Sequence, residues 1–298
     1  MRKVVGLILG LLPISVYAEC VPVPDCASIG YTETSCEGGS LKCPFDTSRL
    51  LCVPCDSSFR FSCVGENIVS AVGSACNGKY ASCTCVEGAT FINGECVCNN
   101  SCNTIGNILY SDYSCNSCII ENKTPVGVVV YADNTKRIAR YLENKSASWV
   151  NNLTDADGNI LVSKNTAVTG LSMFATADEA VLDFDGFNNT KLIADFFGED
   201  ISGGASIDCY RYAPDSLPET KNKWYLPALG ELSNYIYKNQ SVIDKTLQML
   251  GKTKLNYLRH WSSSQYSAGH AWYHIFYGNE YIHSAKNDPL YADCLLAF

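Results

Sequence analysis

The hydrophobic and polar positions along the chain divide it into three stretches. Residues 4–12 form a short, uninterrupted apolar run, and residues 19–118 contain few aliphatic runs but many turn-forming dipeptides. From residue 119 onward the apolar positions recur with the periods typical of strands and helices. This pattern predicts an α+β fold for residues 119–298, preceded by a small segment that is dominated by loops.

Periodicity and capping residues place two strands and three helices in the first part of the α+β region. The strands are expected at 126–131 and 137–142, and the helices at 191–197, from Pro227 to about Ile236, and at 242–250. Asn189 or Thr190 would cap the first helix, and Gly198 would end it.

The last stretch, residues 261–298, interleaves two sets of side chains. Four short strands are expected there, at 261–265, 271–277, 280–284 and 292–298, with a tight turn at Gly278 and Asn279. One set is an apolar scaffold that includes Trp261, Trp272 and Phe276. The other set is polar or amphipathic: Tyr266, His270, Tyr273, His274, Tyr277, Asn279, Tyr281, His283, Lys286, Asn287, Asp288 and Tyr291.

We interpret this second set as a displayed ligand-binding surface. Tyrosine supplies a large, rigid contact area at a low entropic cost, as it does in antibody paratopes. The scaffold aromatics should then be buried, and five of the set should be exposed: Tyr273, Tyr277, Tyr281, His283 and Tyr291. The alternative is that these aromatics fill the core of ordinary strands, which favour aromatic residues in any case.

The first 18 residues predict a secretory signal peptide. Arg2 and Lys3 supply the positive start, residues 4–12 the apolar run, and residues 16–18 the cleavage site. An apolar run of this length is too short to span a bilayer, so no transmembrane segment is expected. We therefore expect an exported chain that works in the periplasm, at the cell surface or in the medium.

Cysteine is the strongest compositional signal. The chain has 17 cysteines, of which 15 lie between Cys20 and Cys118. In an exported chain this density predicts a disulfide-rich stalk or set of small modules at 19–118, because small loop-rich segments need cross-links in place of a core. Residues 83–98 resemble extracellular modules of the epidermal-growth-factor or trypsin-inhibitor-like type. The odd total leaves at least one thiol free, intermolecular or metal-bound, and structural zinc is the alternative for the Cys-x-x-Cys pairs.

The net charge excludes one class of partner. The formal charge is −8, and loss of Arg2 and Lys3 with the leader leaves 20 basic against 30 acidic residues, a net charge of −10. An acidic chain without a basic stripe is not expected to bind nucleic acid.

No cofactor and no metal ion are expected. Asp183, Asp185 and Glu199 lack the ligand spacing of an EF-hand, so we expect solvated loop acids there rather than a calcium site, with the neighbouring phenylalanines 184 and 187 as packing residues. His270 and His274 have the spacing of metal ligands on a helix, but they lie in sequence typical of a strand, with no adjacent glutamate.

Several motifs carry a resemblance to a known family. WYLP at 224–227, GEL at 230–232, WSSS at 261–264 and AW at 271–272 occur in this order, after VGVVV at 126–130. They resemble a family of bacterial exported domains with a C-type-lectin-like fold, related to the formylglycine-generating enzymes. Members of this family occur as targets of diversity-generating retroelements, which mutate scattered codons near the C-terminus.

The resemblance implies a C-type-lectin-like domain at 119–298 and a hypervariable surface formed by the polar and aromatic positions of 261–298. The end of the chain departs from the family. Ala292-Asp293-Cys294-Leu295 replaces a strand that usually contains Val-Arg, which leaves open whether Asp293 is variable or structural.

Three functions remain open. The first is an exported adhesion or recognition protein whose partner is an unknown protein or glycan outside the cell. The second is an enzyme, since the resemblance implies a copper-bound cysteine pair, for which Cys209 and Cys294 are the candidates. A disulfide between these two is the expected state in an oxidising compartment, and the sequence has no coherent set of nucleophile and base, so catalysis is not expected. The third is a structural surface protein.

Overall fold

The computed structural model describes residues 26–27, 30–35, 39–43, 46, 48–53, 60–61, 68–72, 83–92, 95–198, 203–255 and 259–298. The expected signal peptide at 1–18 and Glu199 lie outside these residues. Contacts between Cα atoms divide the chain into two units: residues 1–64 with 70–84 form one, and residues 65–69 with 85–298 form the other.

Up to residue 85 the described residues form short strands. β1 (Gly39–Lys42) and β2 (Leu50–Val53) pair antiparallel, and Cys26 and Cys43 form a disulfide. β3 (Arg60–Phe61), β4 (Ile68–Val72) and β5 (Cys83–Cys85) form a three-stranded sheet. Short strands and a disulfide in this region agree with the cross-linked, loop-rich segment that the cysteine content predicted.

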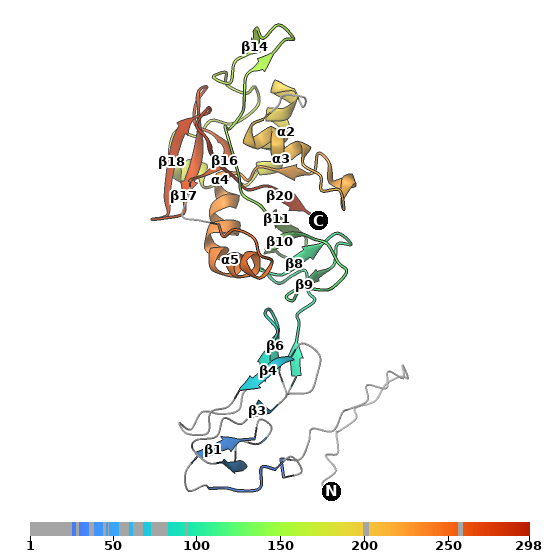
Figure 1. Cartoon of the computed structure of the whole chain (residues 1–298). Helices are drawn as coiled ribbons and strands as arrows, with labels where there is room; N and C mark the ends of the chain where they lie inside the picture. Colours follow the sequence, from blue (N-terminus) through green and yellow to red (C-terminus); the bar gives the residue numbers. More distant parts are fainter. Residues whose placement is uncertain are drawn as a thin grey trace, which may run out of the picture. The chain divides into compact units, whose positions relative to one another are not determined.

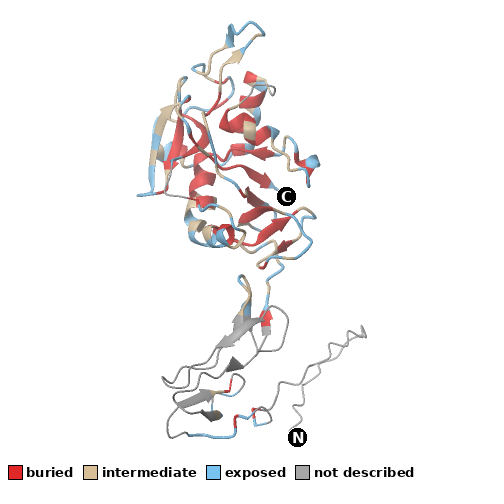
Figure 2. Ribbon diagram, in the orientation of Figure 1, coloured by how far each residue is buried: buried red, intermediate tan, exposed pale blue. Residues whose placement is uncertain are grey.

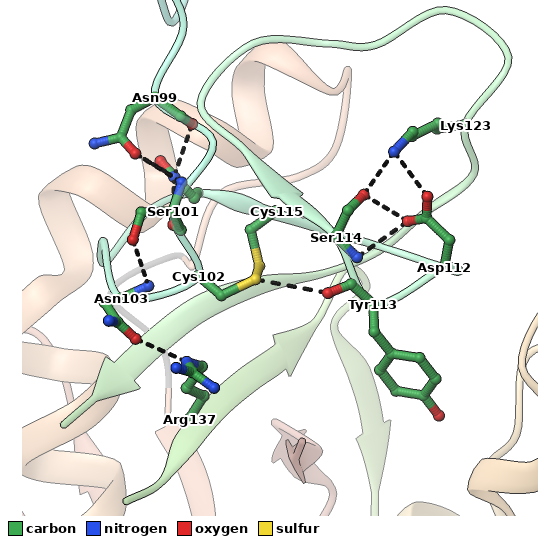
Figure 3. Close-up of a disulfide and its surroundings, with 11 residues drawn as sticks. Asn99, Ser101, Cys102, Asn103, Asp112, Tyr113, Ser114, Cys115, Lys123 and Arg137 are labelled. Atoms are coloured by element: carbon green, nitrogen blue, oxygen red, sulfur yellow. Dashed lines mark hydrogen bonds and ion pairs between the residues drawn. A yellow bond between two sulfur atoms is a disulfide. The ribbon is translucent and has the colours of Figure 1, made fainter. Parts of the chain in front are cut away.

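Residues 85–118 are held by three further disulfides, which join Cys85 to Cys96, Cys98 to Cys118, and Cys102 to Cys115. β6 (Thr90–Ile92) and β7 (Glu95–Val97) form a hairpin here. Beside the last disulfide, Arg137 donates a hydrogen bond to Asn103, and the carboxylate of Asp112 accepts from Lys123 (Figure 3). These bonds tie the disulfide-linked loops to the residues that follow.

The boundary expected at residue 119 does not coincide with a boundary in the sheets. β8 (Ile108–Tyr110) and β9 (Cys115–Asn116) precede it, yet β8 pairs with β10 (Pro125–Ala132), which follows it. Residues from Cys85 onward therefore cluster with the C-terminal part of the chain.

The larger unit contains two principal sheets. The first has six strands in the order β15-β20-β11-β10-β8-β9, where β11 is Arg137–Tyr141, β15 is Trp224–Tyr225 and β20 is Leu295–Ala297. β10 and β11 coincide with the strands expected at 126–131 and 137–142. The second sheet has five strands in the order β12-β19-β16-β17-β18: Lys145–Ala147, Leu290–Ala292, Arg259–Gln265, His270–Ile275 and Glu280–Ala285. A separate hairpin consists of β13 (Leu153–Thr154) and β14 (Ile160–Val162).

The single strand expected at 292–298 is instead two strands in different sheets. β19 ends at Ala292 and pairs in the five-stranded sheet, whereas β20 begins at Leu295 and pairs with β11 and β15. Asp293 and Cys294, which separate them, are both buried. Both residues at the break have buried partners, since Asp293 forms an ion pair with Arg140 and Cys294 a disulfide with Cys209.

The helices lie mainly between residues 177 and 249. They are α1 (Ala177–Ala180), α2 (Gly186–Phe197), α3 (Ala205–Arg211), the 3-10 turn η2 (Pro218–Thr220), α4 (Leu229–Glu231), the π-helical η3 (Leu232–Ile236), the 3-10 turn η4 (Tyr237–Asn239) and α5 (Gln240–Met249). α2 packs against α3 and β16, and α5 against β10 (Figure 1). The last four elements form one continuous helical stretch in place of the two separate helices that the sequence predicted.

α2 begins earlier than predicted. Its N-cap is Asp185, and the expected caps Asn189 and Thr190 are buried within it. Their side chains bond to other segments, since Thr190 Oγ1 donates to Leu226 O and Asn189 Nδ2 to Asp183. Gly198 follows the helix with φ 90°, a conformation that suits glycine at a helix end.

Two larger groups of buried apolar residues lie in the described part of the larger unit. Buried residues are red in Figure 2. The first contains Trp149, Trp224 and Trp261, together with Phe197 of α2. The second lies under α5 and contains Ile243, Leu247 and Phe276. A third, smaller group contains Trp272 with Ala180 and Leu229. The scaffold aromatics of 261–298 therefore lie in the interior, where the sequence placed them.

Candidate binding surface on the β17–β18 hairpin

β17 and β18 form a regular antiparallel hairpin at the edge of the five-stranded sheet (Figure 1). The register is unbroken from His270 opposite Ala285 to Ile275 opposite Glu280. Gly278 and Asn279, at the expected tight turn, have φ of 87° and 55°. Positive φ at consecutive residues is the geometry that tight hairpin turns require, so Gly and Asn suit this place.

The pairing brings aromatic side chains of both strands together on one face. His270, Trp272 and His274 alternate along β17, and the residues opposite the last two are His283 and Tyr281. Alternate residues of a strand share a face, and directly paired residues of two strands lie side by side. The rings therefore form a ladder along the hairpin.

The open end of this ladder is a cluster of four rings. The rings of Tyr266 and His283 are stacked, with centroids 3.6 Å apart and an interplanar angle of 6°. His270 meets His283 edge-on at 5.6 Å, and Trp272 meets the same ring at 5.6 Å. Trp272 is buried against Ala180 and Leu229, and its Nε1 donates to Phe174 O at 3.0 Å. A fixed, buried tryptophan thus supports rings that reach solvent.

At the turn end, hydrogen-bond contacts hold Tyr281 and Asn279 to neighbouring side chains. The Tyr281 hydroxyl lies 2.8 Å from Ser233 Oγ, and Asn279 Oδ1 lies 2.9 Å from His274 Nε2. Tyr277 is 73% exposed. We use the name hairpin surface for six residues: Tyr266, His270, Tyr277, Asn279, Tyr281 and His283.

The structure divides the twelve sequence-predicted ligand-binding residues by exposure. Four are exposed: His270, Tyr277, Asn279 and Asn287. Five are half-buried: Tyr266, Tyr281, His283, Asp288 and Tyr291. Three are buried: Tyr273, His274 and Lys286.

Tyr273, which was expected to be exposed, is only 5% exposed and belongs to the main core. Its ring lies 6.0 Å from that of Trp261, which follows from its place on the face of β17 opposite the aromatic ladder. Strand alternation separates the two faces of β17, but both faces are covered, so the interpretation of Tyr273 as a surface residue is wrong.

His274 is fully buried, in contrast to the expectation, among the rings of Tyr237, Phe276 and Tyr281. Burial lowers the pKa of His274 to about 4, because the charged imidazolium would lose its hydration. Its Nδ1 has no hydrogen-bond partner among the described residues. A neutral, buried histidine of this kind packs the interior of the hairpin.

Lys286 is also fully buried, and its cation is accommodated inside the protein. Nζ donates to Gln265 Oε1 at 2.8 Å and to Thr166 O at 3.2 Å, and it lies 4.5 Å from the ring centre of Trp149. Burial lowers the pKa of Lys286 to about 8. These hydrogen bonds and the face of the Trp149 ring replace the hydration that the ammonium group loses on burial. Lys286 is therefore an internal residue that connects the end of β18 to Gln265 and Thr166.

Asp293 is structural. It is fully buried between Arg140 and His260, with Arg140 Nη2 at 2.6 Å from Oδ1 and His260 Nδ1 at 2.6 Å from Oδ2. Burial alone would raise the pKa of Asp293, but the charge of Arg140 and the bond from His260 outweigh it and hold the pKa well below its usual range. A position with these partners does not tolerate free substitution.

Residues of the sequence motifs that carried the family resemblance take part in a buried polar network with Asp183 and Asn189. Asp183 Oδ2 accepts from Ser264 Oγ at 2.7 Å and from Asn189 Nδ2 at 2.8 Å. Asp183 is therefore buried rather than a solvated loop acid as expected. A Cβ atom at Gly230 would lie 2.5 Å from Asp183 O, so only glycine allows this approach.

The glutamate of the GEL motif is also internal. Glu231 Oε2 accepts from Ala228 N at 3.0 Å, and Tyr225 donates to Oε1 at 3.2 Å. Burial raises the pKa of Glu231 to about 7. The motif thus caps its own helical stretch and packs it against β15, which explains these residue types without a catalytic role.

Cys209 and Cys294, the pair expected to be joined, form a disulfide. A disulfide has no thiolate, the species that would hold a copper ion. The described residues contain no group of three or more His, Cys, Asp and Glu side chains that could hold a metal ion.

The sequence did not predict the exposure of three apolar side chains around the start of α2. Phe184 and Phe187 were expected to be packing residues, yet they are 43% and 40% exposed, and Leu182 is 76% exposed. Each phenylalanine touches a neighbouring ring, Phe184 that of Tyr235 and Phe187 that of Tyr225. The sequence shows that these residues are apolar, but it does not show whether each side chain is fully buried or is packed on one side only.

Comparisons with known proteins identify no family. No protein-family model and no curated protein match the chain. Among solved structures, the chain is similar to a fimbrial protein from Bacteroides ovatus, with a TM-score of 0.46 and 16% sequence identity. The match covers 65% of this chain and 49% of that protein, so the chain spans about half of its length. This similarity does not establish a shared fold or function.

None of the helices in the described part of the chain has the length and apolar character that crossing a membrane requires.

Proposed function

We propose that the chain is an exported ligand-binding protein that contacts a protein or glycan outside the cell through the hairpin surface. The observation that carries this proposal is the stacked pair Tyr266 and His283, accessible to solvent and supported by buried Trp272. Preordered aromatic rings lose little entropy on binding, and they offer apolar faces together with polar edges. Both a sugar ring and a peptide can use such a surface.

We further propose that the larger unit is a C-type-lectin-like domain, preceded by a signal peptide at 1–18 and a disulfide-rich segment. The order of the family motifs supports this proposal, together with the buried network that those motifs form. The domain would begin near Cys85 rather than at residue 119, because β8 and β9 belong to the sheet of β10. Limited proteolysis of the native chain should therefore give a protected fragment that starts near residue 85. A fragment that starts at 119–125 would instead support the domain boundary at residue 119 that the sequence predicted.

The proposal extends to sequence diversification of the surface, as the family resemblance implies. Nine of the twelve positions remain candidates for variation, because Tyr273, His274 and Lys286 are buried. The gene tests this directly. A nearby near-copy of its 3′ end that differs at adenines in the codons of the nine exposed or half-buried positions would support diversification. A near-copy that differs equally at the buried positions would count against this assignment.

The binding proposal is tested with the mature chain, disulfides intact, applied to a glycan array and to an array of extracellular proteins. Saturable binding to a defined subset is the expected result. If neither array shows saturable binding, the chain is better described as a structural surface protein, the third function considered from the sequence. Turnover of a substrate would instead support the enzyme alternative.

A further inference from the structure

Two histidines approach each other at the open end of the aromatic ladder. His270 begins β17, and His283 lies on β18 diagonally across from it, since Trp272 is the residue directly opposite His283. Their ring centroids are 5.6 Å apart and the ring planes are nearly perpendicular, at 88°. His274, the partner that the sequence spacing suggested for His270, is buried further along the same face. The hairpin therefore brings a different histidine to His270.

The separation of the two ring centres is close to that of two imidazoles that share one metal ion. An imidazole nitrogen lies about 1.1 Å from the ring centre and ~2.0–2.1 Å from a bound zinc ion, so each ring centre would be roughly 3.2 Å from the ion. At a tetrahedral angle the two ring centres would then be roughly 5 Å apart. The observed 5.6 Å needs an adjustment of only a few tenths of an ångström.

The nitrogens of these rings are incompletely used by the protein. His283 Nδ1 is buried and has no hydrogen-bond partner among the described residues. The ring of His283 is fixed by stacking on Tyr266, which removes much of the freedom that metal binding would otherwise have to restrict. His270 is exposed, and its Nδ1 lies 3.3 Å from Ser267 Oγ, so Nε2 remains for another partner.

We propose that His270 and His283 form a two-histidine site for a divalent transition-metal ion at the open end of the hairpin. Water or a ligand supplies the remaining coordination positions, since the protein contributes two side chains. The bound ion would link the start of β17 to β18. The site is independent of the proposed ligand-binding function, because it requires only the ion.

The test uses the disulfide-intact mature chain without a histidine tag, titrated calorimetrically with Cu²⁺, Ni²⁺ or Zn²⁺ alone. We expect one ion per chain at this site, and tighter binding of Cu²⁺ than of the other two, as the general order of divalent affinities requires. His270→Gln and His283→Gln should each weaken the affinity at least tenfold. The control Asp157→Asn removes an exposed carboxylate elsewhere and should leave the affinity unchanged.

Electron paramagnetic resonance of the Cu²⁺ form supplies a readout that a folding defect does not imitate. The spectrum should contain couplings to two imidazole nitrogens in the wild type and to one in each histidine variant. Unchanged affinity in either variant, or absence of a saturable site in the wild type, overturns the assignment. Neither result bears on whether the hairpin surface binds a glycan or protein, which is measured separately with no metal ion added.

Discussion

The buried ion pair of Asp293 gives the sharpest prediction about stability. Asp293→Asn keeps the size of the side chain but removes the charge that faces Arg140 and His260. The guanidinium of Arg140, fully buried, would then lack a counter-charge. Removal of one partner of a buried pair costs on the order of 3–5 kcal/mol of the free energy of unfolding. For a domain of this size class the melting temperature should fall by about 6–20 °C.

Urea unfolding at pH 7, followed by tryptophan fluorescence under non-reducing conditions, measures this loss. Asp157→Asn, which alters an exposed carboxylate, is the control and should change the free energy by less than ~0.5 kcal/mol. The pKa of Asp293 is lower in the folded state than in the unfolded state. Its contribution is therefore present above about pH 4 and declines as the pH falls further, so the two proteins should converge in acid. A loss below about 1 kcal/mol at pH 7 would refute the buried-pair account.

Three further predictions use the same unfolding assay. Trp272→Ala should cost on the order of 3–5 kcal/mol, whereas Tyr277→Ala should cost no more than ~0.5 kcal/mol, and equal losses would mean that Tyr277 is a core residue. Because the folded-state pKa of His274 is about 4, below its unfolded value, its stabilising contribution should be lost as the pH falls from about 6.5 to 4, by up to roughly 3 kcal/mol. His274→Gln should remove that part of the pH dependence, and an unaltered slope would contradict the assignment. Joint replacement of Cys209 and Cys294 by serine opens a loop of 85 residues and should cost about 4–5 kcal/mol, while a non-reduced digest that pairs either cysteine elsewhere would rule out this disulfide.

Local sequence signals predicted the elements that depend on local physics. The strand at 126–131 and the turn at Gly278-Asn279 each depend on the residues within the element itself, and both lie where the sequence predicted them. α5 likewise runs close to the helix expected at 242–250. Helix starts are less local: α2 begins five residues earlier than expected, and Asn189 and Thr190 do not cap it but bond to Ser263 and Leu226, which are distant in sequence.

The candidate site was predicted only in part, for a similar reason. Because Lys286 and His274 are polar, the sequence suggested that their side chains are exposed to solvent. In the structure they are covered by Trp149 and Tyr237, which are remote in sequence. Strand alternation correctly separated the faces of β17 but gave no information on whether each face was covered. Burial of polar residues depends on long-range contacts, which one sequence does not specify.

The most direct test of the hairpin surface compares two variants of the mature chain on the arrays that identify a ligand. One variant carries Tyr277→Ser and His270→Ser on the hairpin surface, at two exposed positions. The other carries Ile160→Ser and Leu161→Ser on β14, two residues that are also exposed to solvent but distant in sequence. The account predicts that the first variant loses at least tenfold in affinity at an unchanged melting temperature, while the second binds like the wild type. The account would be contradicted if the first variant kept the wild-type affinity, or if only the second variant lost affinity.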